Sequence, residues 1–564
     1  MSSRVPEIRG QLVILPEMLA ERVERGPHKA RFFMYLAGEL DLLLYKSAWM
    51  GTPPYNRPTL MAVIFYAMYS GHFEYENIVK FVDDSIGAQW ILNGMCVPSY
   101  KTVERTIGAF LEELDSAFAQ ILTLCEQQEL IGGERCYTDG VKVQANASKH
   151  KAMSYEFLGK KITRGKEDLK ILFATLREIV DEWDATEEDF QDVVLEDAAI
   201  VNKGLRSMHQ ESLDKKQEHI FNKDFEETAD QRQAQVESKI EEIKRELKIL
   251  ENVEPEKQDA TIEALNNVAF INKRVTRMEA AKSELEDKWK AENGNKKIPD
   301  GQQINFTDSD SCIMQTKHHG VQQCYNNFAI VDYKANIIMG CYSSNNSSDQ
   351  VSLMPCIERT EQTYGSLEGY TLGSDAGFFS ARNISYTQNK GINFYASYPE
   401  AKSTYAKDKF KYNGDTDAYT CPEGNMLTAP DGTKDFKTRI YCNESACSIC
   451  PKHGDCTKAK DGVRRIERDM EGDILREGAR EKASSAEGRE ILRMRKSVPE
   501  PVWGNIKTQD GFIQMHYRGI EKAGFEFELH CLIQNIRKLL KVYLKSTSFQ
   551  DIVHSKYGDY CKVA

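Results

Sequence analysis

The sequence predicts an α/β protein in which a mixed sheet follows a helical domain and is interrupted by two insertions. Three observations lead to this prediction. Apolar residues recur at helical spacing up to about residue 130, β-type alternation stands on both sides of a long charged stretch, and five cysteines crowd into one late segment. A chain of 564 residues has ample length for several such folding units.

The first predicted unit, residues 1–130, is helical because its apolar positions repeat every three or four residues. Ser99 is placed to cap the helix that carries Lys101 and Arg105. Two interpretations stand side by side. The helices form a helix-turn-helix whose basic residues contact DNA, or they form a bundle that packs on a catalytic domain or on another subunit.

The sheet is predicted in two parts, residues 131–160 and 301–400. Its expected elements are strands at 135–139 and 141–145 with a bend or bulge at Gly140, a hairpin of 324–333 and 336–344, a helix at 350–364, and strands at 369–374 and 392–398. This order describes a mixed sheet in which Asp139 and Asp375 lie on neighbouring strands.

Residues 161–300 form the first predicted insertion. They are rich in Glu, Lys and Leu with many oppositely charged i, i+4 pairs, which predicts long helices or an antiparallel helical hairpin, including 233–253 and 270–290. This arm either joins two subunits or only decorates the core. The second insertion, 401–465, is predicted to be irregular, and 466–564 to return to helix.

Three acidic residues stand in contexts that suit metal chemistry. Asp139 and Asp375 each end a β-rich run beside small residues, and Glu500 follows a charged helical stretch. Carboxylates that converge from distant segments hold Mg²⁺ or Mn²⁺, and two such ions about 4 Å apart assist phosphodiester cleavage. Lys507 lies two helical turns after Glu500 on nearly the same face, where its charge suits a phosphate.

Four segments resemble the DDE transposases of bacterial insertion sequences: YTDGVKVQANAS, residues 306–332, GSDAGFFSARN and VPEPVWGNIK. The resemblance implies an RNase H-like catalytic core in which Asp139, Asp375 and Glu500 bind two Mg²⁺ or Mn²⁺ ions, with Lys507 beside them. It also implies a homodimer on double-stranded DNA that cuts and joins its own terminal inverted repeats. The rival readings are a domesticated, non-catalytic DNA-binding protein and a hydrolytic nuclease of the same fold.

The resemblance extends to the residues around the glutamate. The family signature is Tyr, two residues, Arg, three residues, Glu, six residues, Lys; here Arg493 occupies the tyrosine register and Lys496 the arginine register, with Arg495 as the adjacent alternative. The resemblance implies that these residues contact DNA near the cut. Three polar residues that follow Asp139 are expected to contact the DNA backbone: Lys142, Asn146 and Lys149.

The crowded cysteines form a separate signal. Cys447, Cys450 and Cys456 supply three thiolates, and Cys421 or Cys442 completes a tetrahedral Zn²⁺ site. His453 is a further candidate for the fourth ligand. The alternative is a set of reduced cysteines in a loop.

The charge and hydropathy of the chain narrow the function classes. A net charge of −12 argues against a protein that coats nucleic acid through overall positive charge, although a local basic groove remains compatible with it. The sequence contains no apolar run of the roughly 18 residues that cross a bilayer, so we expect a cytoplasmic protein.

Overall fold

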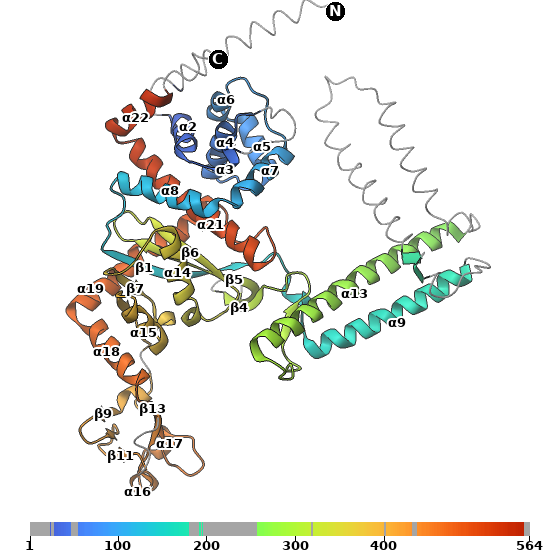
Figure 1. Ribbon diagram of the computed structural model, residues 1–564. Coiled ribbons are helices and arrows are strands. Elements are labelled where there is room, and N and C mark those ends of the chain that lie inside the picture. Colours follow the sequence, from blue (N-terminus) through green and yellow to red (C-terminus); the bar gives the residue numbers. More distant parts are fainter. Residues whose placement is uncertain are drawn as a thin grey trace, which may run out of the picture. The chain divides into compact units, whose positions relative to one another are not determined.

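The structure is a computed structural model that describes residues 23, 28–46, 55–179, 191–192, 194–195, 257–316, 320–399, 402–430 and 437–557. The chain divides into two compact units (Figure 1). Unit 1 contains residues 1–146 and 313–564, and unit 2 contains residues 147–312. No helix in the described ranges is long and apolar enough to cross a membrane.

The N-terminal part of unit 1 is helical, as predicted. Its helices are α2 (Lys29–Glu39), α3 (Leu43–Lys46), α4 (Arg57–Tyr69), α5 (Tyr75–Asp84), α6 (Ile86–Leu92), α7 (Tyr100–Leu111) and α8 (Leu114–Gln127). Ser99 caps α7, because its hydroxyl accepts a hydrogen bond from the Thr102 N–H at 3.3 Å. Helices α21 (Ile520–Tyr543) and α22 (Thr547–Tyr557) pack against this group through α2, α4 and α8.

A mixed sheet lies at the centre of unit 1. Its order is β6 (Ile338–Ser344), β5 (Gly320–Asp332), β1 (Arg135–Gln144), β7 (Thr371–Ser374) and β8 (Asn393–Ala396), and β4 (Cys312–Thr316) also pairs with β5. The pairs β6–β5 and β5–β1 are antiparallel, whereas β1–β7 and β7–β8 are parallel. The predicted hairpin and the two later strands are therefore confirmed.

The predicted bend or bulge at Gly140 is wrong. Strand β1 pairs with β5 residue for residue from Cys136 opposite Asp332 to Gln144 opposite Cys324. A Cβ atom at Gly140 would lie 2.7 Å from Cε1 of the buried Phe328 ring. The Phe328 ring therefore leaves no room for a side chain at position 140, which explains why glycine occupies this position in a regular strand.

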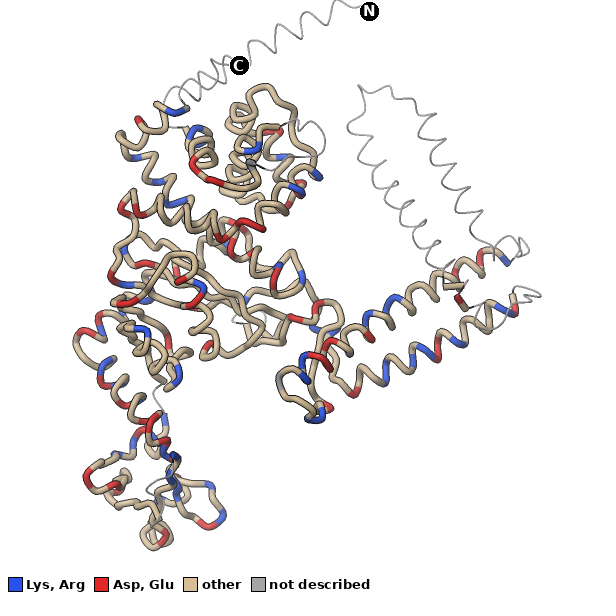
Figure 2. The backbone as a smooth tube through the Cα atoms, viewed as in Figure 1, with Lys and Arg blue, Asp and Glu red and all other residues tan. Residues whose placement is uncertain are grey.

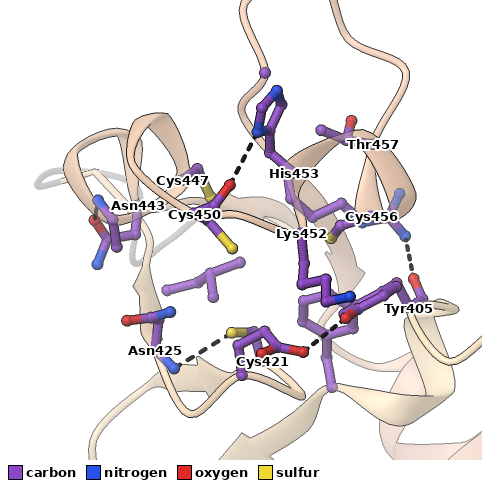
Figure 3. A pocket seen from close by; sticks show the side chains of 16 residues that line it. Tyr405, Cys421, Asn425, Asn443, Cys447, Cys450, Lys452, His453, Cys456 and Thr457 are labelled. Atoms are coloured by element: carbon purple, nitrogen blue, oxygen red, sulfur yellow. Dashed lines mark hydrogen bonds between the residues drawn. The ribbon is translucent and has the colours of Figure 1, made fainter.

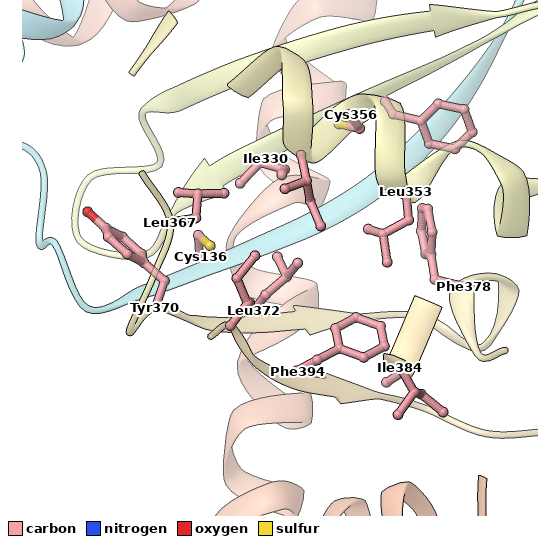
Figure 4. Close-up of a cluster of buried hydrophobic side chains, with 14 of the residues drawn as sticks. Cys136, Ile330, Leu353, Cys356, Leu367, Tyr370, Leu372, Phe378, Ile384 and Phe394 are labelled. Carbon is pink, nitrogen blue, oxygen red and sulfur yellow. The ribbon is translucent and has the colours of Figure 1, made fainter. Parts of the chain in front are cut away.

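Helices cover both faces of the sheet. The face covered by α14 (Leu353–Thr363) and α15 (Ala381–Asn389) carries the main apolar core (Figure 4), which includes Cys136, Phe328, Ile330, Leu353, Leu372 and Phe394. Successive residues of β6 point to opposite faces of the sheet. A Cβ atom at Gly340 would contact Thr360 of α14, whereas the neighbouring Cys341 forms a side-chain hydrogen bond with Cys531 of α21 on the other face.

Helix α19 (Ala486–Met494) lies on the same side as α21. A Cβ atom at Gly373 would meet Tyr137 of β1 and Ile491 of α19, whereas the neighbouring Leu372 faces the main core.

The described residues of 402–430 and 437–469, called here the cysteine module, contain more regular structure than predicted. Short strands form two small sheets: β9 (Lys411–Asn413), β10 (Ala418–Thr420) and β11 (Met426–Thr428) in one, and β12 (Thr438–Tyr441) and β13 (Ile466–Asp469) in the other. Two short helices, α16 (Glu444–Ser448) and α17 (His453–Cys456), lie within the module, and the helix predicted from residue 466 begins after β13, at α18 (Gly472–Ser484). Strands of three or four residues are too short to show a reliable alternation in sequence.

Unit 2 contains the predicted antiparallel helical hairpin. The start of α9 (Tyr155–Ile179) packs on the end of α13 (Gln258–Asn293) through Leu158 and Leu285, and the end of α9 packs on the start of α13 through Leu176 and Leu265. Strands β2 (Ala152–Ser154) and β3 (Gln303–Asn305) pair at its base. The helix predicted at 233–253 lies outside the described residues.

Candidate active site

Asp139 lies in the middle of β1, and Asp375 is the residue that follows the adjacent parallel strand β7. The β1–β7 ladder pairs Arg135 with Thr371 and Tyr137 with Gly373, and the same register continued by two residues places Asp139 beside Asp375. Alternate residues of a strand point to the same face of the sheet. Asp139 is two residues after Tyr137 and Asp375 is two residues after Gly373, and Tyr137 and Gly373 lie on the face that α19 covers. The pairing of β1 with β7 thus brings two segments that are more than two hundred positions apart in the chain to adjacent places in the sheet.

Backbone N–H groups orient both carboxylates. Oδ1 of Asp139 accepts a hydrogen bond from the Gly140 N–H at 3.0 Å. Oδ1 of Asp375 accepts one from the Gly377 N–H at 2.9 Å and so caps the short 3₁₀ turn η4 (Ala376–Phe378). Bonds of this kind hold each carboxylate in one direction.

Arg495 approaches the aspartates from the segment after α19. It lies in the 3₁₀ turn η6 (Arg495–Ser497), and its Nη1 is 3.8 Å from Oδ1 of Asp139. The Arg495 side chain is 18% exposed and that of Asp139 is 16% exposed. Lys496 and Arg493 are exposed. The arginine that reaches the site is therefore Arg495, one position away from the register of the family signature.

Glu500 and Lys507 lie on α20 (Pro499–Gln509), which packs on β1 and β5. Pro499 stands at the first helical position, where its missing N–H costs nothing. Glu500 is in the first turn and Lys507 in the last, and both are exposed. The opposite side of the helix is buried through Val502, Trp503 and Ile506.

The end of α20 is fixed by a buried charge. Asp510, the residue after the helix, has a fully buried side chain that forms an ion pair with Arg537 of α21. Nδ1 of His530, also on α21, lies 3.0 Å from Oδ2 of Asp510. These contacts attach the helix that carries Glu500 and Lys507 to the core of unit 1.

Sequence reasoning missed one acidic residue at this site, Asp349. It begins the turn η3 (Asp349–Val351), and its Oδ1 accepts a hydrogen bond from Nδ2 of Asn326 on β5 at 2.8 Å. A Cβ atom at Gly377 would lie 2.6 Å from Oδ2 of Asp349 and 3.1 Å from Oδ1 of Asp375, so the two carboxylates are near one another. The sequence offered little to indicate Asp349, because its one visible feature is its position shortly after the strand predicted at 336–344.

The residues predicted to contact DNA lie in several places, and the basic residues are spread over both units (Figure 2). Lys101 and Arg105 are exposed on α7, Lys142 is half-buried on β1, and Lys149 is exposed in unit 2. Asn146 is engaged within unit 1, because its side-chain amide donates a hydrogen bond to the His516 carbonyl at 2.7 Å.

No three or more His, Cys, Asp or Glu side chains in the described ranges are grouped so that they could hold a metal ion. The candidate site consists of Asp139 with Arg495 beside it, Asp375 with Asp349 near it, and the helix α20 that packs on β1 and presents Glu500 and Lys507.

Comparison with known proteins gives one match. Residues 420–540 match the family model described as "Transposase DDE domain". This segment begins at the end of β10 in the cysteine module and extends through α18, α19 and α20 into α21, so it includes Glu500 and Lys507 but neither aspartate. No curated protein and no solved structure gives a significant match. The match supports a transposase of the DDE type with DNA as its partner.

Proposed function

We propose that the protein is a DDE transposase that binds the terminal inverted repeats of its own insertion sequence and catalyses metal-dependent cleavage and strand transfer. The observation that carries this proposal is the pairing of β1, which holds Asp139, with β7, which Asp375 follows, together with the approach of Arg495 to Asp139 and the packing of the helix of Glu500 and Lys507 on β1. The matched family segment contains this helix, so the two lines of support concern the same site.

The topology supports an RNase H-like core. Three antiparallel strands are followed by a helix, a parallel strand, a second helix and a second parallel strand, which gives the order β6–β5–β1–β7–β8. In this arrangement β1 is central, and it brings its aspartate to the strand that precedes Asp375. The cysteine module is inserted between β8 and the helices that complete the core.

The donor set suits a hard divalent cation. Asp139, Asp375 and Glu500 offer carboxylate oxygens, which Mg²⁺ and Mn²⁺ prefer over nitrogen or sulfur. Bound ions would activate the attacking hydroxyl and stabilise the leaving oxygen. The protein's own part is to orient the two aspartates through backbone N–H groups and to place the cations of Arg495 and Lys507 near the phosphate.

The test compares Asp139→Asn, Asp375→Asn and Glu500→Gln with the unchanged protein on duplex DNA that carries the sequence flanking the gene. Each variant should lose Mg²⁺-dependent cleavage by at least about a hundredfold while end binding in a mobility-shift assay is retained. The matched control is Glu368→Gln, another exposed glutamate of unit 1, and it should cleave normally.

Other results of this test would support a different function or a different site. Specific binding by the unchanged protein without any cleavage would indicate a non-catalytic DNA-binding protein. Cleavage without joining of the 3′ end to a target duplex would indicate a nuclease. Normal cleavage by either aspartate variant would refute the proposed site.

A further inference from the structure

Four of the five crowded cysteines line one small cavity in the cysteine module. Cys421, Cys447, Cys450 and Cys456 surround a space of about 30 Å³, and Figure 3 shows their sulfur atoms directed toward it. A space of this size holds a single water-sized particle. Cys442 is not among the lining residues. It lies instead at a backbone bridge, where its N–H and carbonyl both bond to Thr428.

Two tight turns contain three of these cysteines, Cys421 in the first and Cys447 and Cys450 in the second. In the first, the Gly424 N–H donates to the Cys421 carbonyl at 2.9 Å, and the Asn425 N–H donates to the Cys421 sulfur at 3.3 Å. Gly424 has φ +82°, a left-handed conformation that glycine adopts without strain. In the second turn, the Cys450 N–H donates to the Cys447 carbonyl at 3.2 Å.

The segment that carries three of the cysteines has almost no core of its own. Helices α16 (Glu444–Ser448) and α17 (His453–Cys456) contain no buried residue, and Ile449 between them is 83% exposed. The apolar cluster of the module is formed by other segments: Phe410, Tyr419, Leu427, Tyr441 and Ile466. Cys456 of α17 packs against this cluster, but α16 and α17 bury little apolar surface, and small domains in this situation depend on a metal or a disulfide.

We propose that Cys421, Cys447, Cys450 and Cys456 bind one structural Zn²⁺ through four thiolates. Four protein ligands close the coordination shell, so the ion stabilises the fold and takes no part in chemistry. The four sulfur atoms are not yet grouped at ligand spacing within the described residues, so binding at Zn–S distances of about 2.3 Å would draw the two turns together.

The fourth ligand is thereby assigned to Cys421 rather than Cys442 or His453. Cys442 stands outside the cavity. His453 also lines the cavity, with its Nδ1 2.9 Å from the carbonyl oxygen of Cys450. Four thiolates already complete a tetrahedral shell, so the site does not require His453 as a ligand.

The experiment measures the zinc content of the full-length protein, purified under reducing conditions, by mass spectrometry of the metal. We expect one zinc per chain in the unchanged protein, in Cys442→Ser and in His453→Ala, and a loss of most zinc in Cys421→Ser and Cys450→Ser. Cys442→Ser is the matched control, because it removes a thiol of the same module outside the cavity. The Co²⁺-substituted protein should show the intense visible bands of a tetrahedral tetrathiolate site.

A second measurement covers the case in which a cysteine variant fails to fold. Alkylation of the unchanged zinc-loaded protein, mapped by peptide mass spectrometry, should spare the four cavity cysteines and modify Cys442. Added chelator should make all five reactive. Absence of zinc, a disulfide among these cysteines, or zinc loss in Cys442→Ser would overturn the proposal. None of these readouts depends on DNA cleavage, so this proposal and the proposed function can fail separately.

Discussion

Replacement of Arg495 by alanine tests how the active site is assembled. Its guanidinium is 3.8 Å from Asp139, and both side chains are less than one-fifth exposed. Exposed ion pairs contribute about 0.2–1 kcal/mol, whereas breaking a fully buried pair costs about 3–5 kcal/mol. This pair lies between those limits. Those values refer to folding; for the cleavage step, we expect the loss of the positive charge that orients Asp139 to raise the activation free energy by about 1.4 kcal/mol, which equals about tenfold in rate.

The assay is single-turnover cleavage of duplex DNA that carries the element end, with saturating Mg²⁺. Arg495→Ala should cleave about ten times more slowly, and Arg495→Lys should recover part of the rate because it restores a positive charge near Asp139. The control is Arg489→Ala, an exposed arginine on α19 of the same charge. A rate for Arg495→Ala within twofold of the unchanged protein would refute this account, as would an equal loss in the control.

Three further predictions concern neighbouring contacts. Asp349→Ala removes the acceptor of the Asn326 amide beside Asp375, so DNA cleavage should fall by about tenfold while end binding is retained, and an unchanged cleavage rate would contradict this. Asp510→Asn leaves Arg537 without its buried counter-ion and should lower the free energy of unfolding in urea by about 3 kcal/mol; a loss below about 1 kcal/mol would be contrary to the structure. Burial raises the pKa of Glu528 from 4.5 to about 7 despite the opposing charge of Arg359, so the folded protein binds the extra proton and its stability should fall as the pH rises between these values. Glu528→Gln should flatten that decline in a series of urea titrations, whereas an identical pH profile would argue against it.

The helices and longer strands could be predicted from the sequence because their signals are local. The apolar spacing before residue 130, the cap at Ser99 and the hairpin of β5 and β6 all follow from neighbours along the chain. The same holds for the antiparallel hairpin of α9 and α13. The short strands of the cysteine module were missed because three residues cannot display a period.

The role of Gly140 and the contact of Arg495 could not be predicted in this way. Gly140 was expected to break a strand, but its function is to admit the Phe328 ring from the opposite strand. Arg468 is similar. It lies in a basic stretch of the sequence, yet it is 1% exposed, with its guanidinium carbon 3.7 Å from the centre of the Tyr412 ring. In each case the partner is remote in sequence, so no local pattern indicates it.

The sequence by itself determined the mixed α/β class and the five cysteines as a group, because residue type and periodicity act over short distances. The pairing of β1 with β7, which brings the segments of Asp139 and Asp375 together, joins residues remote in sequence. Only the tertiary structure decided that Arg495 rather than Lys496 faces Asp139, that Asp349 lies near Asp375, and that Cys421 rather than Cys442 lines the cavity. These facts depend on which surfaces pack together, and one residue of register turns a side chain by about 100° on a helix and to the opposite face on a strand.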